Sequence, residues 1–144
     1  MQVSHILAAK GDRVATIAAG ATVAEALAEL RHWNVGALVV SPDGARIDGI
    51  LSERDIVRAL AGAGAAVLDR RVSELARTDV VTCRLTTAGA ELMATMTKRR
   101  IRHVPVVEDG RLCGIVSIGD VVKSRVDELE SERDQLSDYI TTGR

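Results

Sequence analysis

The stretch Gly49-Ile50-Leu51-Ser52-Glu53-Arg54-Asp55-Ile56 recurs later in the chain as Gly114-Ile115-Val116-Ser117-Ile118-Gly119-Asp120-Val121. We call residues 49–56 the first corner and residues 114–121 the second corner. A glycine before aliphatic residues predicts the end of a strand. A serine followed three positions later by Asp predicts a helix start, with Asp replacing the Glu or Gln of a capping box. Such a turn from strand to helix presents backbone N–H groups, which favour anions.

The two corners belong to an internal repeat. Before the hairpin the chain matches itself at a shift of 66 residues, in the pairs Thr16 and Thr82, Glu25 and Glu91, Leu30 and Met96, Val35 and Ile101. Each unit predicts strand, helix, strand, strand, helix. One sheet with two helices on one face leaves its other face bare, so two copies bury those faces together. We therefore expect an α/β (α+β) fold with pseudo-two-fold symmetry.

The predicted elements follow from hydrophobic periodicity and turn chemistry. Helices are expected at about residues 3–9, 22–33, 52–62, 72–75 and 90–96, and from residue 117. Strands are expected at residues 14–17, 37–40, 47–51, 80–83, 104–107 and 112–116, with turns at Pro42-Asp43-Gly44 and Asp109-Gly110. Residues 65–71 connect the halves. We divide the chain into a first domain (1–68), a second domain (69–125) and a helical extension (126–144).

Composition excludes several classes of function. The chain has 144 residues, 47% of them hydrophobic, with a formal net charge of −1 and 1% aromatic residues. Without aromatic platforms or a basic footprint, nucleic-acid binding is not expected, although Lys98 to Arg102 form a small basic cluster. No apolar run is long enough for a membrane span, so we expect a cytoplasmic protein without a membrane partner. Cys83 and Cys113 are expected to be buried, reduced thiols, and neither a metal site nor a catalytic motif is found.

The end of the chain predicts a long helix with a coiled-coil-like seam. Apolar residues recur there at steps of three and four, with Arg133 as the interruption: Val122, Val126, Leu129, Leu136 and Ile140. This face either packs back on its own body or pairs with a second copy.

The repeat resembles a tandem pair of CBS (cystathionine β-synthase) domains, a Bateman module, present here as a stand-alone protein. The resemblance covers residues 1 to about 125. Besides the corners, it is carried by Thr22-Val23-Ala24-Glu25-Ala26 and Arg100-Ile101-Arg102-His103-Val104-Pro105-Val106-Val107. It implies adenine-nucleotide binding in two clefts between the halves, and a disc-like homodimer. AMP is the first expected ligand; ADP, ATP, NAD(H) or S-adenosylmethionine are alternatives, and no metal is required.

The resemblance also implies roles for individual residues. Asp55 and Asp120 accept hydrogen bonds from a ribose diol, and Ser52 and Ser117 bind ribose or phosphate oxygens. The remaining expected contacts are an apolar wall for adenine from Ile50 and Ile115, and backbone edges for the base at Ala15, Thr16, Val81 and Thr82. In the family's geometry each cleft combines the corner of one half with the first strand of the other.

Phosphate groups require cations, and these precede one strand of the second half. We expect Arg102 and His103 to face the phosphates, with Arg99 and Arg100 as possible solvated charges at a helix end. The first half has Gly36 and Ala37 at the positions of Arg102 and His103. Its cleft is therefore empty, uses Arg54, takes a phosphate held from across the interface, or has room for a dinucleotide.

Two functions remain open at this point. One is a non-enzymatic sensor that binds an adenine nucleotide and changes how it meets a downstream protein. The other is a structural dimerisation module with vestigial clefts, because Ser-x-x-Asp caps a helix whether or not a ligand binds.

Overall fold

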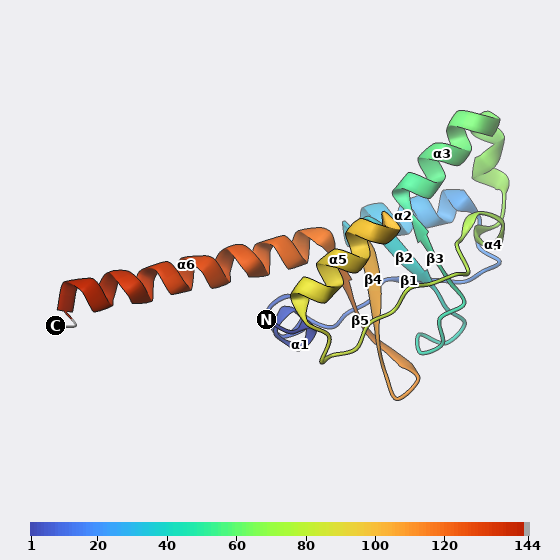
Figure 1. The fold of residues 1–144 in the computed structure, drawn as a ribbon. Helices are drawn as coiled ribbons and strands as arrows, with labels where there is room; N and C mark the ends of the chain where they lie inside the picture. The colour runs from blue at the N-terminus through green and yellow to red at the C-terminus, as the bar shows by residue number, and fades with distance from the viewer. Residues whose placement is uncertain (143–144) are drawn as a thin grey trace.

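The computed structural model describes residues 1–142, in which each repeat forms a small sheet covered by helices (Figure 1). In the first half, β2 (Ala37–Val40) lies between β1 (Thr16–Ile17), which is parallel to it, and β3 (Gly49–Ser52), which is antiparallel. Its helices are α2 (Val23–Trp33) and α3 (Glu53–Ala63). In the second half, β4 (His103–Glu108) pairs with β5 (Arg111–Ser117), beside α5 (Gly89–Arg99) and α6 (Ile118–Thr142). The predicted α+β duplication is confirmed.

The predicted strand at residues 80–83 is wrong in length, because only Cys83 forms a bridge, parallel to Val106. In the first half, the amide of Val39 donates to the carbonyl of Ala15 at 3.1 Å. The repeat places Pro105 at the position of Val39, and proline has no N–H to donate. The bond that would hold Val81 in the sheet is therefore missing, and the second sheet loses most of its first strand.

The segment before each half packs against the other half. The helix α1 (Val3–Lys10) contributes Val3, Ile6 and Leu7 to the core of the second half. The 3-10 helix η1 (Gly64–Asp69) and helix α4 (Val72–Leu75) contribute Val67 and Val72 to the core of the first half. Residues 65–71 are thus part of a core as well as a connection. We call the stretches that lead up to Lys10 and to Arg77 the exchanged segments, because each packs on the half that it does not precede. They hold the two halves together. The division at residues 68 and 125 stays a prediction.

The glycine that opens each corner lies where an exchanged segment approaches closely. A Cβ atom added to Gly49 would lie 2.8 Å from the backbone oxygen of Arg77, which pairs with Ile50. A Cβ atom added to Gly114 would lie 2.6 Å from Leu7 Cδ1 of α1. The recurring glycine therefore provides room for a neighbouring chain segment.

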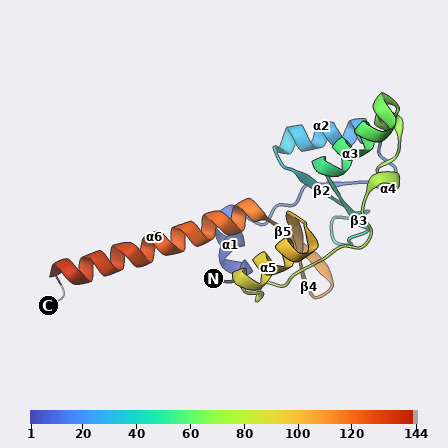
Figure 2. The ribbon, with the colours of Figure 1, turned by 45° about the horizontal axis from the view of Figure 1, so that its top comes forward.

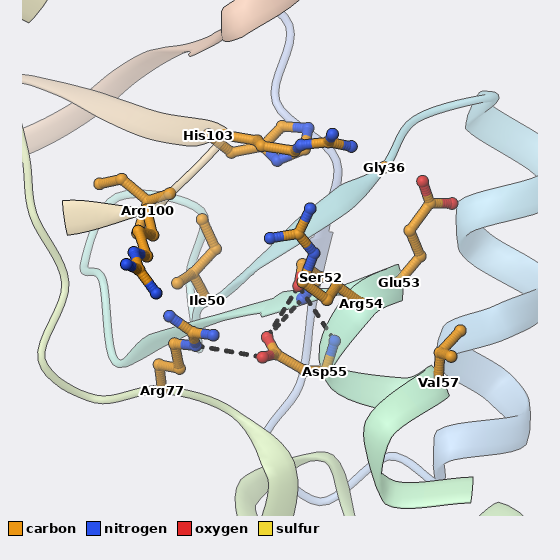
Figure 3. A pocket seen from close by; sticks show the side chains of 12 residues that line it. Gly36, Ile50, Ser52, Glu53, Arg54, Asp55, Val57, Arg77, Arg100 and His103 are labelled. Carbon is orange, nitrogen blue, oxygen red and sulfur yellow. Dashed lines mark hydrogen bonds and ion pairs between the residues drawn. The ribbon is translucent and has the colours of Figure 1, made fainter. Parts of the chain in front are cut away.

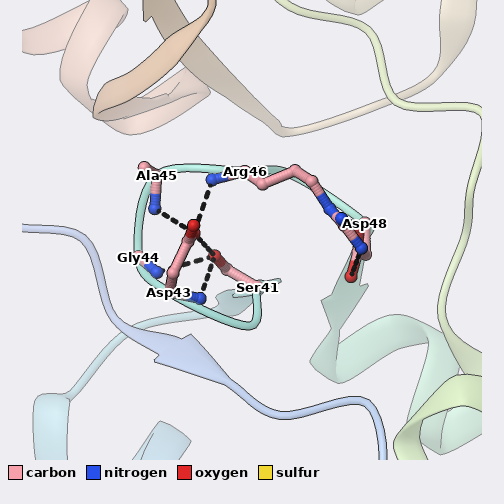
Figure 4. A network of polar contacts seen from close by, with 6 residues as sticks. All are labelled: Ser41, Asp43, Gly44, Ala45, Arg46 and Asp48. Atoms are coloured by element: carbon pink, nitrogen blue, oxygen red, sulfur yellow. Dashed lines mark hydrogen bonds and ion pairs between the residues drawn. The ribbon is translucent and has the colours of Figure 1, made fainter.

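The turn predicted from Pro42-Asp43-Gly44 lies between β2 and β3, and Gly44 has a positive φ of 79° there. Side chains organise this loop. The Ser41 hydroxyl accepts from the amide of Gly44 at 2.8 Å, and Asp43 Oδ1 accepts from Ala45 and Arg46, both at 2.9 Å (Figure 4). The amides of Arg46 and Ala45 hold the pKa of Asp43 below its usual value. The carbonyl of Ala45 accepts from the amide of Leu112 at 2.8 Å, so this loop also joins the two halves.

Helix α6 extends away from both halves (Figures 1 and 2). Its first turns pack on the second half through Val121, which is buried, and Ile118, which is partly buried. Residues 129–142 are exposed throughout. The long terminal helix is confirmed, and the alternative in which its seam packs back on the body is wrong. No helix of residues 1–142 has the length and apolar character needed to cross a membrane.

Candidate functional site

Both corners form reciprocal helix caps. In the first corner, the Ser52 hydroxyl accepts from the Asp55 amide at 3.2 Å, and Asp55 Oδ2 accepts from the amide and the hydroxyl of Ser52 at 3.0 and 2.9 Å (Figure 3). In the second corner, the Ser117 hydroxyl accepts from the Asp120 amide at 3.1 Å, and Asp120 Oδ2 accepts from the Ser117 amide at 2.8 Å. The predicted capping with Asp in place of Glu is confirmed.

The backbone amides of these corners are largely engaged inside the protein. Besides the capping bonds, the amide of Glu53 donates to the carbonyl of Gly36 at 3.0 Å, and the amide of Ile118 donates to the carbonyl of Arg102 at 2.8 Å. The expectation that these helix N-termini present open N–H groups to an anion is therefore wrong for these positions. Anion binding at either corner falls mainly to cationic side chains.

Each corner carboxylate holds a cation from an exchanged segment. Arg77 Nε donates to Asp55 Oδ1 at 3.1 Å, and the Asp55 side chain is 11% exposed. Lys10 Nζ donates to Asp120 Oδ2 at 2.7 Å and to the carbonyl of Ile115 at 2.9 Å. Sequence reasoning missed Lys10 and Arg77, although each stands a few residues before the first strand of its half.

The electrostatics of Asp120 follow from this contact. Burial raises the pKa of its carboxyl group, but hydrogen bonds from Lys10 and Ser117 outweigh burial and lower the pKa below the ordinary value. Asp120 therefore stays ionised at neutral pH.

The first corner opens into a cavity of about 380 Å³ between the two halves (Figure 3). The first half contributes Ile50, Ser52, Arg54 and Asp55 to its wall. The second half contributes Arg100, Ile101, Arg102 and His103, and Arg77 and Glu53 also line it. The sequence left open how the cleft at the first corner binds phosphate. The observed lining matches the alternative in which arginines of the second half face this cleft from across the interface, together with Arg54. We call this cavity the first cleft.

The imidazole of His103 lies at the junction of the halves and lines three cavities. These are the first cleft and the two cavities described in the next two paragraphs. A Cβ atom added to Gly36 would lie 3.2 Å from both Cε1 and Nε2 of His103. His103 therefore packs directly against Gly36, and the room for a dinucleotide beside this small residue stays a prediction. Burial lowers the pKa of His103, which favours the neutral ring.

A neighbouring cavity of about 360 Å³ shares Ile50 and His103 with the first cleft. Val81 and Arg99 also line this cavity, which places Val81, one of the residues expected to hold the base, next to the first corner. Thr82 is exposed and lines none of the three cavities described here.

The second corner opens into a different cavity, of about 370 Å³, which we call the second cleft. Ile115, Ser117 and Asp120 line it together with Ala15 from the start of the first half, as the resemblance implies. Thr16 does not line it. Its cations are Lys10 and Arg13, and the Arg13 guanidinium lies 4.3 Å from the centre of the Trp33 ring. Arg102 faces the first cleft instead, so the two clefts differ in charge and shape.

Metal-binding chemistry is not evident in residues 1–142, where no group of three or more His, Cys, Asp or Glu side chains is positioned to hold an ion. Cys83 and Cys113 are free thiols; Cys83 is buried, as expected, whereas Cys113 is only partly buried. Burial raises the pKa of Cys83 to about 11. A thiol with this pKa remains protonated and unreactive at neutral pH.

Comparisons with known proteins agree with this architecture. The CBS domain family model matches residues 5–62 and again residues 72–127. The mitochondrial CBS domain-containing protein CBSX3 of Arabidopsis thaliana is 36% identical over 126 residues, which cover 85% of this chain and 61% of that protein. The match therefore spans less than two thirds of that relative's length.

Two solved structures show how closely the fold is shared. A CBS-domain containing protein of Agrobacterium tumefaciens is 44% identical, with a TM-score of 0.84 over 87% of this chain and 99% of that one. A CBS domain pair in complex with 5′-methylthioadenosine and S-adenosyl-L-methionine is 25% identical, with a TM-score of 0.78 over 89% of this chain and 98% of that one. The duplicated corners, the exchanged segments and these matches establish that the chain belongs to the CBS domain family, as a tandem pair of CBS domains.

Proposed function

We propose that this CBS pair is a regulatory module that binds an adenine nucleotide in the first cleft and signals by a change in conformation or assembly. Asp55 and Ser52 hold the ribose, and Arg54, Arg100 and Arg102 hold the phosphates. Adenine lies against Ile50, toward Val81 in the neighbouring cavity. The observation that carries the proposal is the meeting of a Ser-Asp corner from one half with cations from the other, in a cavity of about 380 Å³. Ligand sites in proteins commonly have volumes of about 300–1,000 Å³.

The charge of the first cleft favours a ligand with phosphate groups. Within residues 1–142, no ion pair within 4 Å involves Arg54, Arg100 or Arg102, and all three are exposed. Guanidinium groups bind phosphate oxygens in pairs of parallel hydrogen bonds, which makes arginine well suited to this role. AMP remains the simplest ligand, and three arginines accommodate the longer phosphate chains of ADP and ATP.

The solved relative with bound adenosine derivatives supports an adenosine-containing ligand. S-adenosylmethionine carries a positive sulfonium group and no phosphate, which suits a cleft lined by several arginines poorly. We therefore expect phosphate-bearing nucleotides to bind more tightly than S-adenosylmethionine.

Arg77 links the proposed ligand site to the rest of the structure. Asp55 already accepts three hydrogen bonds, out of roughly four positions that a carboxylate offers. A ribose diol needs two positions, so binding displaces the Arg77 side chain from Asp55. Arg77 is also bonded to Ile50 through its backbone, at 2.9 Å in both directions. Displacement therefore alters the contact between an exchanged segment and the first corner, and shifts the population toward the arrangement that binds ligand best.

A second candidate function is a structural dimerisation module, without catalytic activity and without a regulatory ligand. One observation favours it: both corner carboxylates are already capped and paired, Asp55 with Arg77 and Asp120 with Lys10. A corner whose only role is to stabilise the fold needs these caps and ion pairs and no ligand.

A thermal-shift panel with AMP, ADP, ATP, NAD(H) and S-adenosylmethionine separates the two functions. A nucleotide that binds the native state raises the unfolding temperature in proportion to the logarithm of its concentration. Stabilisation by at least one nucleotide, accompanied by nucleotide absorbance in the purified protein, supports the sensor. If none of the five ligands shifts the transition at millimolar concentration, the structural module is the correct function.

A further inference from the structure

An exposed apolar stripe runs along helix α6 and is not used by either half. Its members are between 45% and 66% exposed: Val122, Val126, Leu129, Leu136 and Ile140. Both views show the helix extending away from the body, so the stripe lies outside the two cores (Figures 1 and 2). A row of apolar side chains this long on one helix face is unfavourable in water unless something covers it.

The spacing of the stripe is that of a coiled coil. Steps of four, three, four, three and four residues connect Val122, Val126, Leu129, Arg133, Leu136 and Ile140, which corresponds to alternating d and a positions of heptads. The d positions are Val122, Leu129 and Leu136, and the a positions are Val126, Arg133 and Ile140. β-branched residues at a with leucine at d favour two parallel strands, and one polar residue at a sets the register.

We propose that the α6 helices of two copies of this chain form a parallel two-stranded coiled coil through this seam. The residue types at a and d favour a second copy in parallel orientation, and one complementary charge pair agrees with it. In that orientation, Arg125 at g faces Glu130 at e of the second copy. The antiparallel alignment that pairs all six layers would instead place Glu130 against Glu130 and Glu132 against Glu132, which is repulsive.

Arg125 and Arg133 set the strength of this contact. Arg125 forms an ion pair with Glu128 of its own helix, so its pairing with the second copy exchanges one acidic partner for another. In the parallel pair, Arg133 of one copy lies in the same layer as Arg133 of the second copy, which is unfavourable. Glu132 of each copy lies beside this layer and offsets part of that cost. A seam of six layers, one of which contains two arginines, predicts an assembly that dissociates on dilution. The assembly does not depend on a nucleotide.

Sedimentation equilibrium of the full chain over a range of concentrations tests the seam. We expect a concentration-dependent association that the double variant Leu129→Glu/Leu136→Glu weakens. The double variant Ser131→Glu/Gln135→Glu adds the same charge on the outer face of the same exposed helix segment and should leave the equilibrium unchanged. Arg133→Ile should tighten dimerisation by about tenfold or more, because it completes the apolar seam.

Cross-linking tests the orientation. Ile140→Cys places two thiols together only in a parallel pair, so mild oxidation should give a covalent dimer. The wild-type chain, with Cys83 and Cys113, is the control for unrelated cross-links. Adding Leu129→Glu/Leu136→Glu to the Ile140→Cys variant should abolish the covalent dimer. An unchanged dissociation constant in Arg133→Ile overturns the seam, and a dimer in which Ile140→Cys does not cross-link overturns the parallel orientation.

Discussion

Lys10 donates a 2.7 Å hydrogen bond to Asp120, which lies 110 residues further along the chain. Arg77 makes the corresponding contact with Asp55 in the first corner. In both cases, a segment that precedes one half supplies a cation to the acid of the other half. The two corners are therefore held by the same exchange of segments that joins the hydrophobic cores.

Replacing Lys10 tests this contact through its pH dependence. The folded-state pKa of Asp120 lies below its ordinary value, so its contribution to stability is present above the ordinary pKa and is lost as the pH falls through the folded pKa. Lys10→Met should lower the free energy of unfolding by roughly 1 kcal/mol at pH 7, and by less once the pH has fallen through the folded pKa of Asp120. Urea unfolding at pH 7 and at low pH measures the difference, with Lys98→Met as the control. An equal loss at both pH values contradicts the assignment.

Removing the corner acids separates ribose binding from helix capping. Asp55→Ala should weaken the most strongly stabilising nucleotide by roughly 10- to 100-fold, because it removes hydrogen bonds to a charged group. Asp120→Ala removes the equivalent cap from the second corner, away from Arg102, and is the matched control. Isothermal titration calorimetry gives the affinities, and circular dichroism confirms folding. If Asp120→Ala loses affinity and Asp55→Ala keeps it, the nucleotide occupies the second cleft.

Neutralising Arg102 should weaken phosphate binding while leaving the fold intact, because this side chain is exposed and lines the first cleft. We expect Arg102→Gln to weaken ATP roughly tenfold, with a smaller effect on AMP. The salt dependence of binding should also decrease, since one charge pair is lost. Arg111→Gln, at an exposed position at the start of β5, is the charge-matched control. Equal losses for the two variants would show that only net charge matters.

Adding a methyl group at the first corner tests the close approach of the exchanged segment. Gly49→Ala would bring Cβ within 2.8 Å of the backbone oxygen of Arg77, so either β3 or the Arg77 segment must shift. We expect a loss of about 1–3 kcal/mol in the free energy of unfolding. Gly20→Ala, where a Cβ would meet nothing within 4 Å, is the control. Thermal unfolding compares the stabilities of the two variants. Equal stabilities would mean that the close approach of the Arg77 backbone to Gly49 does not contribute to the fold.

Local features of the chain were predictable from the sequence. The helix caps at Ser52 and Ser117 and the turns at Gly44 and Gly110 depend on residues close together in the chain, so the sequence predicts them directly. The strand at residues 80–83 was not predictable in this way. Its loss follows from Pro105, whose missing N–H matters only once the partner strand is known.

The sequence by itself determined that two equivalent units exist, each with a corner that joins a strand to a capped helix, because the repeat and the capping pattern are local. Only the tertiary structure decided which charges meet which corner. Arg102 lies beside the first corner, Lys10 occupies the second, and His103 packs against Gly36. The physical reason is that these contacts cross between halves, and spacing along the chain does not specify how two similar halves pack.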